Sequence, residues 1–378
     1  MRAVLPLRPL PFVLLLLLLL VADGSVPAAE EVPLAAPFTC NATAKASCQA
    51  LLGYVPPNAT TYAAIKSLFQ VRSLRSLLGA NGLPISTHSS AAVPAGSTVR
   101  VRFPCSCSHG TGVSARNHPV YKVKADDGLD AIARNVFNGF VTYQEIAAAN
   151  NISDPNKIEV GQKLWIPLPC SCDPVDGAAV VHYAHVVAAG SSVDAIAAEF
   201  GTDVDVLLRL NGISDPKKLL AGQVLDVPLR ACSSSISNTS IDRHLRLPND
   251  SYALTANDCV LCSCSSSTWQ LNCQPTQGIS SSTCPAAKCG SLYLGNASSI
   301  SACENTLCAY AGYTNTTKFT IHTNLTTLSL CNNGSAPQSQ PSNSSAPGLG
   351  LQGLNWMELF ITVHIGLLCF GFLWRGTN

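Results

Sequence analysis

The stretch from 150 to 172 reads NNISDPNKIEVGQKLWIPLPCSC, and most of it returns at 211–229 as NGISDPKKLLAGQVLDVPL. Eleven of the nineteen aligned residues are identical. Each copy holds a polar loop, a Gly-Gln pair and a short apolar segment with a proline. The chain therefore contains an internal repeat, and each copy should fold as one supersecondary unit.

The segments before this stretch predict a strand and two helices in each copy. Alternating residues at 120–125 and 182–188 indicate a short strand. Apolar residues then recur at i, i+3, i+4 and i+7, starting from Leu129 and from Val193, which is typical of an amphipathic helix. Asp127 is expected to cap this helix in the first of these copies, and Ser191 in the second.

A second helix and a closing strand complete the predicted unit. Thr142 and Glu145 form a capping box ahead of the second helix in one copy, and Asp203 caps it in the other. Pro167 and Pro228 confine the last strand to an edge or end it. We expect a strand, helix, helix, strand unit whose two strands pair antiparallel, with both helices on one face.

A third, more divergent copy precedes these two. Asn81 aligns with Asn150, and Gly96 aligns with Gly161. The loop between Asn81 and Gly96 is four residues longer than its counterpart. The copies are bounded at 40–107, 119–172 and 182–232, and each is small enough to need covalent staples.

The N-terminus carries the pattern of a secretory signal. Arg2 and Arg8 are followed by an apolar run over 11–21 and by small residues over 22–29. This order is typical of a cleaved signal peptide, which we place at 1–25. The mature chain is then expected to reach an oxidising, extracellular compartment.

The C-terminus carries a second targeting pattern. An apolar segment over 359–374 follows small residues and a spacer, which is typical of a glycosylphosphatidylinositol (GPI) attachment signal. We expect residues 354–378 to be exchanged for lipid at Ser345 or an adjacent residue, after a linker over 332–353. The alternative is a single membrane span, for which this segment is short. The predicted location is the extracellular face of the plasma membrane.

Cysteine usage and glycosylation sequons agree with secretion. The chain has 17 cysteines, and sixteen remain without Cys369 of the C-terminal signal, an even number consistent with eight disulfides. Neighbouring cysteines of a Cys-x-Cys pair do not bond comfortably with each other, so they should bridge between units. The ten Asn-x-Ser/Thr sequons predict glycosylation at Asn41, Asn58, Asn151, Asn238, Asn249, Asn296, Asn315, Asn324, Asn333 and Asn343.

Several function classes find no support in the sequence. The net charge is +1, with no basic run that would indicate nucleic-acid binding. Asp126, Asp127 and Asp130 suit a helix N-terminus better than a catalytic carboxylate set. The cysteines at 259, 262 and 264 are expected in disulfides rather than around a metal. The eight histidines form no pattern with Ser, Asp or Cys, and we expect no cofactor.

The repeated units resemble the lysin motif (LysM), a βααβ carbohydrate-binding module. The similarity lies in YKVKADDGLDAIARNVF, in the stretch from 150 to 168, and in their second-copy counterparts. Tandem units joined by Cys-x-Cys pairs, between a signal peptide and an anchor signal, resemble the plant chitin elicitor-binding proteins. The resemblance implies an α+β fold with three tandem LysM modules, followed by a small β-rich, cysteine-rich domain over 233–331.

The same resemblance implies a disulfide pattern and a binding site. The disulfides are Cys40 to Cys107, Cys48 to Cys172 and Cys105 to Cys170. In LysM units the sugar lies between the loop after the first strand and the loop after the second helix. Carried onto the middle copy, these are Asp126, Asp127, Gly128, Leu129 and Asp130, facing Asn150, Asn151, Ile152, Ser153, Asp154 and Pro155. The third copy has a different first loop, over 189–192, and is expected to bind weakly or serve structurally.

Finally, the resemblance implies a non-enzymatic receptor for chitin oligosaccharides in plant immunity. The expected partners are a second copy of the chain, recruited by ligand, and a transmembrane LysM receptor kinase as co-receptor. Peptidoglycan is the alternative ligand, and a wall-modifying hydrolase or a wall-adhesion protein the alternative function. Trp165 could stack on sugar or pack against a neighbouring unit, and a glycan on Asn151 could hinder the ligand or project away from it.

Overall fold

The computed structural model describes residues 38–40, 46–108, 110–276, 278–279, 283–316 and 318–329. Several predicted features lie outside these ranges. They are the signal peptide at 1–25, the linker at 332–353, the anchor signal at 354–378, and Asn41, Asn333, Asn343 and Ser345. In the described part of the chain, no helix is both long and apolar enough to cross a bilayer.

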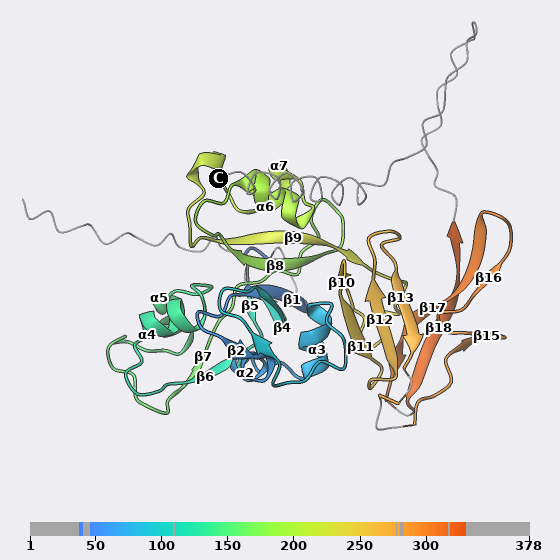
Figure 1. Ribbon diagram of the computed structural model, residues 1–378, viewed down its shortest axis with the longest axis horizontal. Coiled ribbons are helices and arrows are strands. Elements are labelled where there is room, and N and C mark those ends of the chain that lie inside the picture. The colour runs from blue at the N-terminus through green and yellow to red at the C-terminus, as the bar shows by residue number, and fades with distance from the viewer. Residues whose placement is uncertain are drawn as a thin grey trace, which may run out of the picture. The chain divides into compact units, whose positions relative to one another are not determined.

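The first unit, over 46–108, runs strand, helix, helix, strand (Figure 1). The side chains of Thr61 and Ser73 each accept a hydrogen bond from the backbone three residues on, which begins the two helices. Its elements are β1 Ala46–Tyr54, α2 Tyr62–Leu68, α3 Leu74–Ala80 and β4 Val99–Ser108, with the short pair β2 Thr60–Thr61 and β3 Ala92–Val93 in the loops. Strands β1 and β4 pair antiparallel.

The second unit, over 120–165, has the same order of elements with shorter strands. The predicted capping box is present, because Thr142 and Glu145 each accept a hydrogen bond from the other's backbone. Its elements are β6 Val120–Lys122, α4 Leu129–Ala131, η1 Ile132–Val136, α5 Tyr143–Ala149 and β7 Lys163–Trp165. Segment η1 continues α4 as a π-helix, in which the Phe137 N–H reaches the Ile132 carbonyl.

The third unit, over 180–232, has the longest strand pair of the two clear repeats. Asp203 caps its second helix, as predicted, whereas Ser192 caps its first helix in place of the predicted Ser191. Gly201 ends the first helix in the left-handed conformation. Its elements are β8 Val180–Val186, α6 Val193–Phe200, α7 Val204–Leu210, the 3-10 turn η2 Pro216–Lys218 and β9 Val224–Cys232.

Each unit is closed by an asparagine bridge at the end of its second helix. The side-chain nitrogen donates to a carbonyl one turn back in the helix and to a carbonyl of the last strand, and the side-chain oxygen accepts from that strand residue's N–H. All nine distances lie between 2.7 and 2.9 Å. The bridges join Asn81 to Arg100, Asn150 to Trp165 and Asn211 to Asp226. The bridged residues are 19 apart in the first unit and 15 apart in the others, so the longer loop of the first unit leaves the bridge intact.

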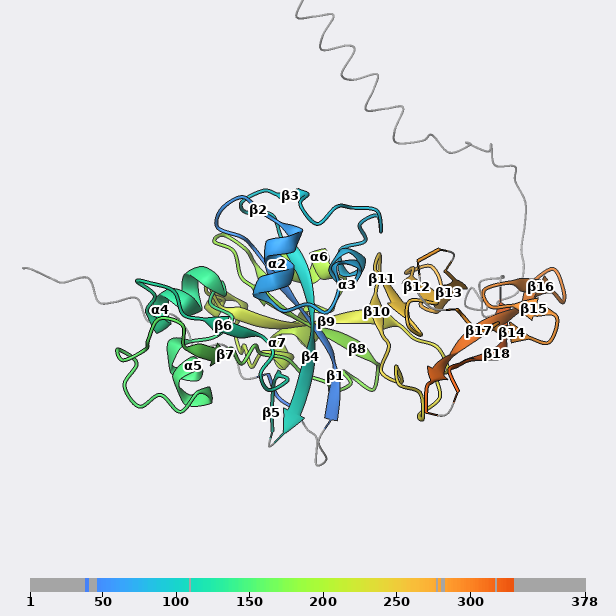
Figure 2. The same ribbon diagram turned by 90° about the horizontal axis from the view of Figure 1, so that it is seen from below.

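The first and third units share one six-stranded sheet, ordered β10-β9-β8-β1-β4-β5. Its outer strands are β5, at Thr111–Ser114, and β10, at Leu247–Pro248 of the cysteine-rich region. Strands β1 and β8 are parallel neighbours in this sheet. Leu51 packs with the core of the third unit, whereas the next residue, Leu52, packs with the core of the first and second. Strand β1 is therefore covered on both faces, by α6 and α7 on one side and by α2 and α3 on the other (Figures 1 and 2).

Three disulfides hold the units together, with the pairing that the family resemblance implies: Cys40 to Cys107, Cys48 to Cys172 and Cys105 to Cys170. Two of them join the first unit to the segment after the second unit. The third, Cys40 to Cys107, lies within the span 40–107, so the expectation that these cysteines bridge only between units was wrong for this pair. It joins the N-terminal segment to the end of β4.

The cysteine-rich region, over 233–329, contains strands and no helix among its described residues. Its strands are β10 Leu247–Pro248, β11 Tyr252–Thr255, β12 Val260–Cys264, β13 Leu271–Pro275, β14 Lys288–Cys289, β15 Leu292–Tyr293, β16 Ala297–Ser299, β17 Glu304–Thr314 and β18 Thr320–Ser329. Disulfides among its described residues join Cys232 to Cys264, Cys259 to Cys284, Cys262 to Cys273 and Cys289 to Cys308. The 259, 262 and 264 triplet is thus disulfide-bonded, as expected.

Candidate functional site

The first predicted site loop, between β6 and α4 of the second unit, is closed by Asp127. Its carboxylate accepts hydrogen bonds from the Lys124 N–H at 2.7 Å and from the Tyr121 hydroxyl at 2.9 Å. Burial of Tyr121, with its bond to Asp127, raises the pKa of the tyrosine to about 12. Asp126 has a φ of 64°, which turns the chain. The loop is therefore held in one shape before any ligand arrives.

This arrangement corrects the predicted helix caps. Helix α4 begins after Gly128, not after Asp127, because the Asp127 side chain is used inside the loop. In the third unit the cap is Ser192 rather than Ser191. Asp130 lies in the first turn of α4 and pairs with Arg134 at 2.8 Å, in a salt bridge whose side chains are more than half exposed.

The second predicted loop follows α5. Asn151 is exposed, with a φ of 54°, and the Ile152 N–H bonds back to the Ala147 carbonyl at 2.9 Å. The Asp154 carboxylate accepts from the Asn156 N–H at 3.1 Å and pairs with Lys157 at 3.2 Å. The backbone bond from Asn156 and the Lys157 ammonium hold the pKa of Asp154 below its usual value. Ser153 is exposed, and Pro155 is half-buried.

The predicted site residues divide into structural and available groups. Leu129 is only 2% exposed and belongs to the core, while Ile152 packs against the same core and stays partly exposed. Both side-chain N–H groups of Asn150 are used in the asparagine bridge. The two loops are thus joined through one apolar cluster, and the surface they offer consists of backbone groups, carboxylates, the exposed side chains of Asn151 and Ser153, and part of Ile152 and Pro155.

Trp165 is half-buried, and its indole N–H is covered without a hydrogen-bond acceptor among the described residues. The backbone N–H and carbonyl of Trp165 are both hydrogen-bonded to the Asn150 side chain. In the pairing of β6 with β7, Val120 lies opposite Trp165. Gln70 of the first unit bonds both backbone groups of Val120, so this edge of the second unit is held by the first. The strand pair that carries Trp165 therefore lies against the first unit.

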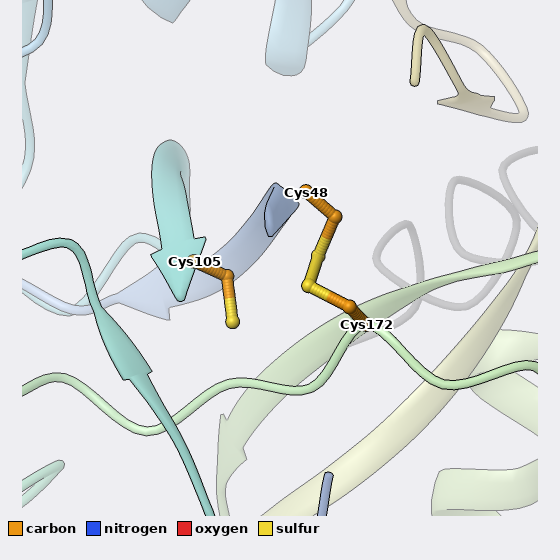
Figure 3. A group of neighbouring side chains, drawn as sticks. All are labelled: Cys48, Cys105 and Cys172. Carbon is orange, nitrogen blue, oxygen red and sulfur yellow. A yellow bond between two sulfur atoms is a disulfide. The ribbon is translucent and has the colours of Figure 1, made fainter. Parts of the chain in front are cut away.

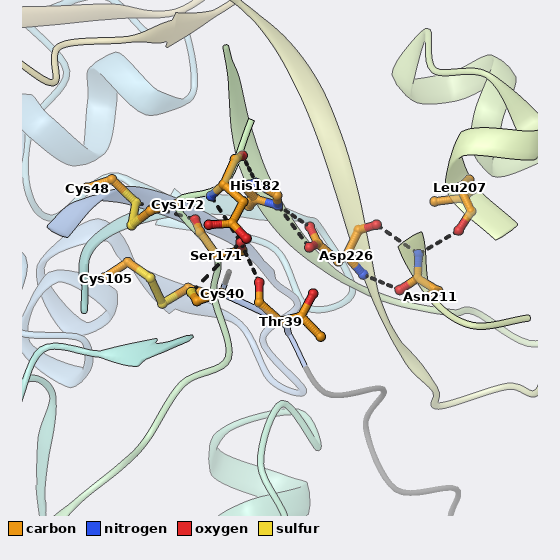
Figure 4. Close-up of polar contacts among 12 residues, drawn as sticks. Thr39, Cys40, Cys48, Cys105, Ser171, Cys172, His182, Leu207, Asn211 and Asp226 are labelled. Carbon is orange, nitrogen blue, oxygen red and sulfur yellow. Dashed lines mark hydrogen bonds and ion pairs between the residues drawn. A yellow bond between two sulfur atoms is a disulfide. The ribbon is translucent and has the colours of Figure 1, made fainter. Parts of the chain in front are cut away.

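Sequence reasoning missed a buried ion pair in the third unit. His182 and Asp226 are 2% and 3% exposed, and the imidazole Nδ1 lies 2.8 Å from the carboxylate (Figure 4). The imidazole Nε2 lies 2.8 Å from the Asp173 carbonyl. Both ring nitrogens thus face acceptors, which fits a protonated imidazolium. Burial lowers the pKa of His182, but Asp226 and the Asp173 carbonyl outweigh it and leave the pKa raised.

A cleft of about 490 Å³ lies beside this pair. Its lining includes Ser171 and Arg209, and Ser171 donates to the Thr39 carbonyl at 2.8 Å (Figure 4). The Ser171 hydroxyl donates to the Thr39 carbonyl, and the His182 Nε2 faces the Asp173 carbonyl. Ser, His and Asp are therefore all present, but the serine is not hydrogen-bonded to the histidine as it would be in a hydrolytic triad. The cleft is a junction between the N-terminal segment, the segment after the second unit, and the third unit.

Cys48, Cys105 and Cys172 bring three sulfur atoms within 4.8 Å of one another (Figure 3). Cys48 and Cys172 are bonded to each other, and Cys105 is bonded to Cys170. A metal would need thiolates, and a disulfide sulfur carries no such charge. The cluster is therefore two neighbouring disulfides rather than a metal centre.

The asparagines of seven predicted sequons are among the described residues. Six of their asparagines are exposed: Asn58, Asn151, Asn238, Asn296, Asn315 and Asn324. Asn249 is half-buried, and its side chain bonds the Ser266 N–H at 2.6 Å and the Asp250 carboxylate at 2.7 Å. Asn249 is therefore part of a folded turn, unlike the other six.

With this geometry in place, the LysM domain model matches residues 121–167 and 185–228. The chain is 48% identical to the chitin elicitor-binding protein of Oryza sativa subsp. japonica, over 90% of this chain and 92% of that one. The chain belongs to this LysM protein family. It is also 46% identical to LysM domain-containing GPI-anchored protein 2 of Arabidopsis thaliana, over 88% of this chain and 91% of the other.

Among solved structures, the ectodomain of a receptor-like kinase aligns with a TM-score of 0.41 and 22% identity, over 48% of this chain and 91% of that one. The matched LysM residues are those of the second and third units, so both of the clear repeats are LysM modules. Of the two relatives, the rice protein is named for binding a chitin elicitor and the Arabidopsis protein for its LysM domain and GPI anchor.

Proposed function

We propose that this protein is a cell-surface receptor that binds chitin oligosaccharides and has no catalytic activity. The observation that carries the proposal is the 48% identity, over 90% of the chain, to a chitin elicitor-binding protein. The first unit, over 40–107, has the same asparagine bridge as the other two. It is proposed to be a LysM module as well, ahead of the modules at 119–172 and 182–232. The cysteine-rich region over 233–331 is proposed as a small β-rich domain that follows these modules and joins the sheet of the third unit through β10.

The ligand site is proposed in the second unit, between 126–130 and 150–155. N-acetylglucosamine oligomers are uncharged and rich in acetamide groups, which pair with backbone N–H and C=O groups of loops. The exposed part of Ile152 offers an apolar contact for an acetyl methyl. A contact of that size contributes about 1 kcal/mol, so a single site should bind modestly.

Modest single-site binding requires avidity for a sharp response. A long oligomer that reaches two receptor molecules joins them, and the second contact then forms at high effective concentration. We therefore propose a ligand-induced homodimer, with a transmembrane LysM receptor kinase as the partner that transmits the signal. Lipid attachment at Ser345 would hold the receptor on the extracellular face of the plasma membrane, where such a kinase is accessible.

The third unit is proposed to bind weakly or to serve structurally. Its first loop is built from Ala189, Gly190, Ser191 and Ser192, and it has no counterpart of the Asp127 carboxylate. Its helix α7 carries Arg209, which pairs with Asp176 of the segment after the second unit at 2.7 Å. This edge of the third unit is thus used within the molecule.

The test is a titration of the purified ectodomain with chitin oligomers of graded length. Ile152→Lys should weaken binding at least about tenfold, because a charged side chain replaces the apolar contact. Ile213→Lys is the matched control, since Ile213 occupies the same place in the third unit and packs partly buried in the same way. Isothermal titration calorimetry measures the affinity, and light scattering measures the dimer.

Other outcomes select the alternatives. Binding to peptidoglycan fragments alone would replace chitin as the ligand. Shortened oligomers after incubation would instead indicate a wall-modifying hydrolase. Equal losses from Ile152→Lys and Ile213→Lys would remove the second unit as the specific site.

A further inference from the structure

The cysteine-rich region contacts helix α3 of the first unit through strand β11. Arg75 of α3 pairs with Asp258 at 3.1 Å and reaches the Ile279 carbonyl at 3.4 Å. The Tyr252 hydroxyl donates to the Leu83 carbonyl at 2.8 Å. The residues joined by these three contacts are 183, 204 and 169 positions apart in the sequence.

The contact is close enough to require glycine. A Cβ at Gly79 would lie 2.3 Å from the Tyr252 carbonyl oxygen and 2.9 Å from its ring. One at Gly82 would lie 2.5 Å from the Asp250 carbonyl oxygen, and Gly82 also has a φ of 62°. Any side chain at Gly79 would therefore separate the two surfaces, because backbone atoms cannot move aside as a flexible side chain can.

The asparagine bridges identify the same position in the other units. Two residues before the bridging asparagine stand Gly79, Ala148 and Arg209. Gly79 is buried, whereas Ala148 and Arg209 are exposed. The first unit alone combines a glycine with burial at this position, as expected if a neighbouring backbone covers it.

The covered loop of the first unit is the counterpart of the proposed sugar-binding loop of the second. Leu83 follows Asn81 by two residues, as Ile152 follows Asn150, and both N–H groups make the same bond to the preceding helix. In the first unit, however, the Leu83 carbonyl already has a donor in Tyr252. The loop of the first unit that corresponds to the proposed sugar-binding loop is thus already bonded to the cysteine-rich region.

We infer that the first unit is the docking site of the cysteine-rich region and that this contact excludes chitin from its helix-two loop. The receptor then presents the loop of the second unit as its sugar-binding loop. The exclusion rests on the proposed chitin function, whereas the docking does not. The two parts can therefore fail separately.

The docking is tested by hydroxyl-radical footprinting of Tyr252 and by hydrogen exchange over 79–84. Gly79→Arg should raise the labelling of Tyr252 several-fold, because the arginine forces β11 away. Ala148→Arg is the matched control and should leave Tyr252 labelled as in the wild type. If Gly79→Arg fails to fold, Tyr252→Ala opens the contact from the other side, and faster exchange over 79–84 is the readout. Unchanged labelling of Tyr252 in Gly79→Arg, together with unchanged exchange over 79–84 in Tyr252→Ala, would overturn the docking.

The exclusion is tested on the wild-type ectodomain with a chitin oligomer. Exchange should slow over 150–155 and stay unchanged over 81–84. Slower exchange over both loops would overturn the exclusion. Slower exchange over neither would count against the proposed sugar site, while the footprinting result would still decide the docking.

Discussion

The second and third units share 11 of 19 residues over their best-matched stretch, yet their neighbours differ. Strands β6 and β7 form a two-stranded sheet, whereas β8 and β9 lie inside the six-stranded sheet. Where β7 has the half-buried Trp165, β9 has the buried Asp226, paired with His182. The repeat thus specifies the fold of a unit, and the few residues that differ on its outer faces specify what it packs against.

The largest expected effect comes from breaking the buried ion pair between His182 and Asp226 of the third unit. Asp226→Ala leaves His182 buried beside no carboxylate and should lower the free energy of unfolding by about 3–5 kcal/mol. Arg100→Ala, at the equivalent strand position of the first unit, should cost far less, because Arg100 is only half-buried. Urea denaturation compares the two variants, and equal midpoints would contradict the special status of this pair.

The asparagine bridges, which all units share, should give an intermediate effect. Replacing one by alanine removes three hydrogen bonds and leaves strand backbone groups unpaired, at a cost of about 1–3 kcal/mol. Asn211→Ala should cost most, since Asn211 is 7% exposed while Asn81 and Asn150 are half-buried. Native-state hydrogen exchange would show the loss in the altered unit. A uniform loss across all units would mean that the units do not open independently.

The smallest expected effect is a pH dependence in the third unit. His182 has a raised pKa in the folded state, so its stabilising contribution is complete below a pH of about 6.5 and is lost as pH rises through the folded-state pKa. His185 has a pKa lowered by burial, so its contribution runs in the opposite direction. The difference between wild type and His182→Gln isolates the first effect. The difference in melting temperature between the two proteins should shrink as the pH of the thermal melt is raised. A difference that stays constant with pH would argue against an imidazolium at His182.

The predictable part of the site was local. The capping box at Thr142, the cap at Asp203 and the order of elements follow from residue patterns within a few positions of one another. The caps at Asp127 and Ser191 were each wrong by one residue. In the second unit the reason is visible, since Asp127 bonds Tyr121 and Lys124 and is not free to cap the helix. Leu129, predicted at the groove, is core because the helix begins after Gly128 and turns this side chain inward.

The amino-acid sequence by itself determined the repeating unit, because apolar periodicity and turn residues act within each copy. Only the tertiary structure decided which outer faces are covered. The His182 and Asp226 pair joins residues 44 apart, and Tyr252 reaches Leu83 across 169 positions. Such contacts depend on how complete units pack, and no spacing along the chain encodes them. The same reason applies to Gly79 and Ala148. Both are small residues at the same position of their units, and only the packing of β11 on the first unit makes Gly79 buried while Ala148 stays exposed.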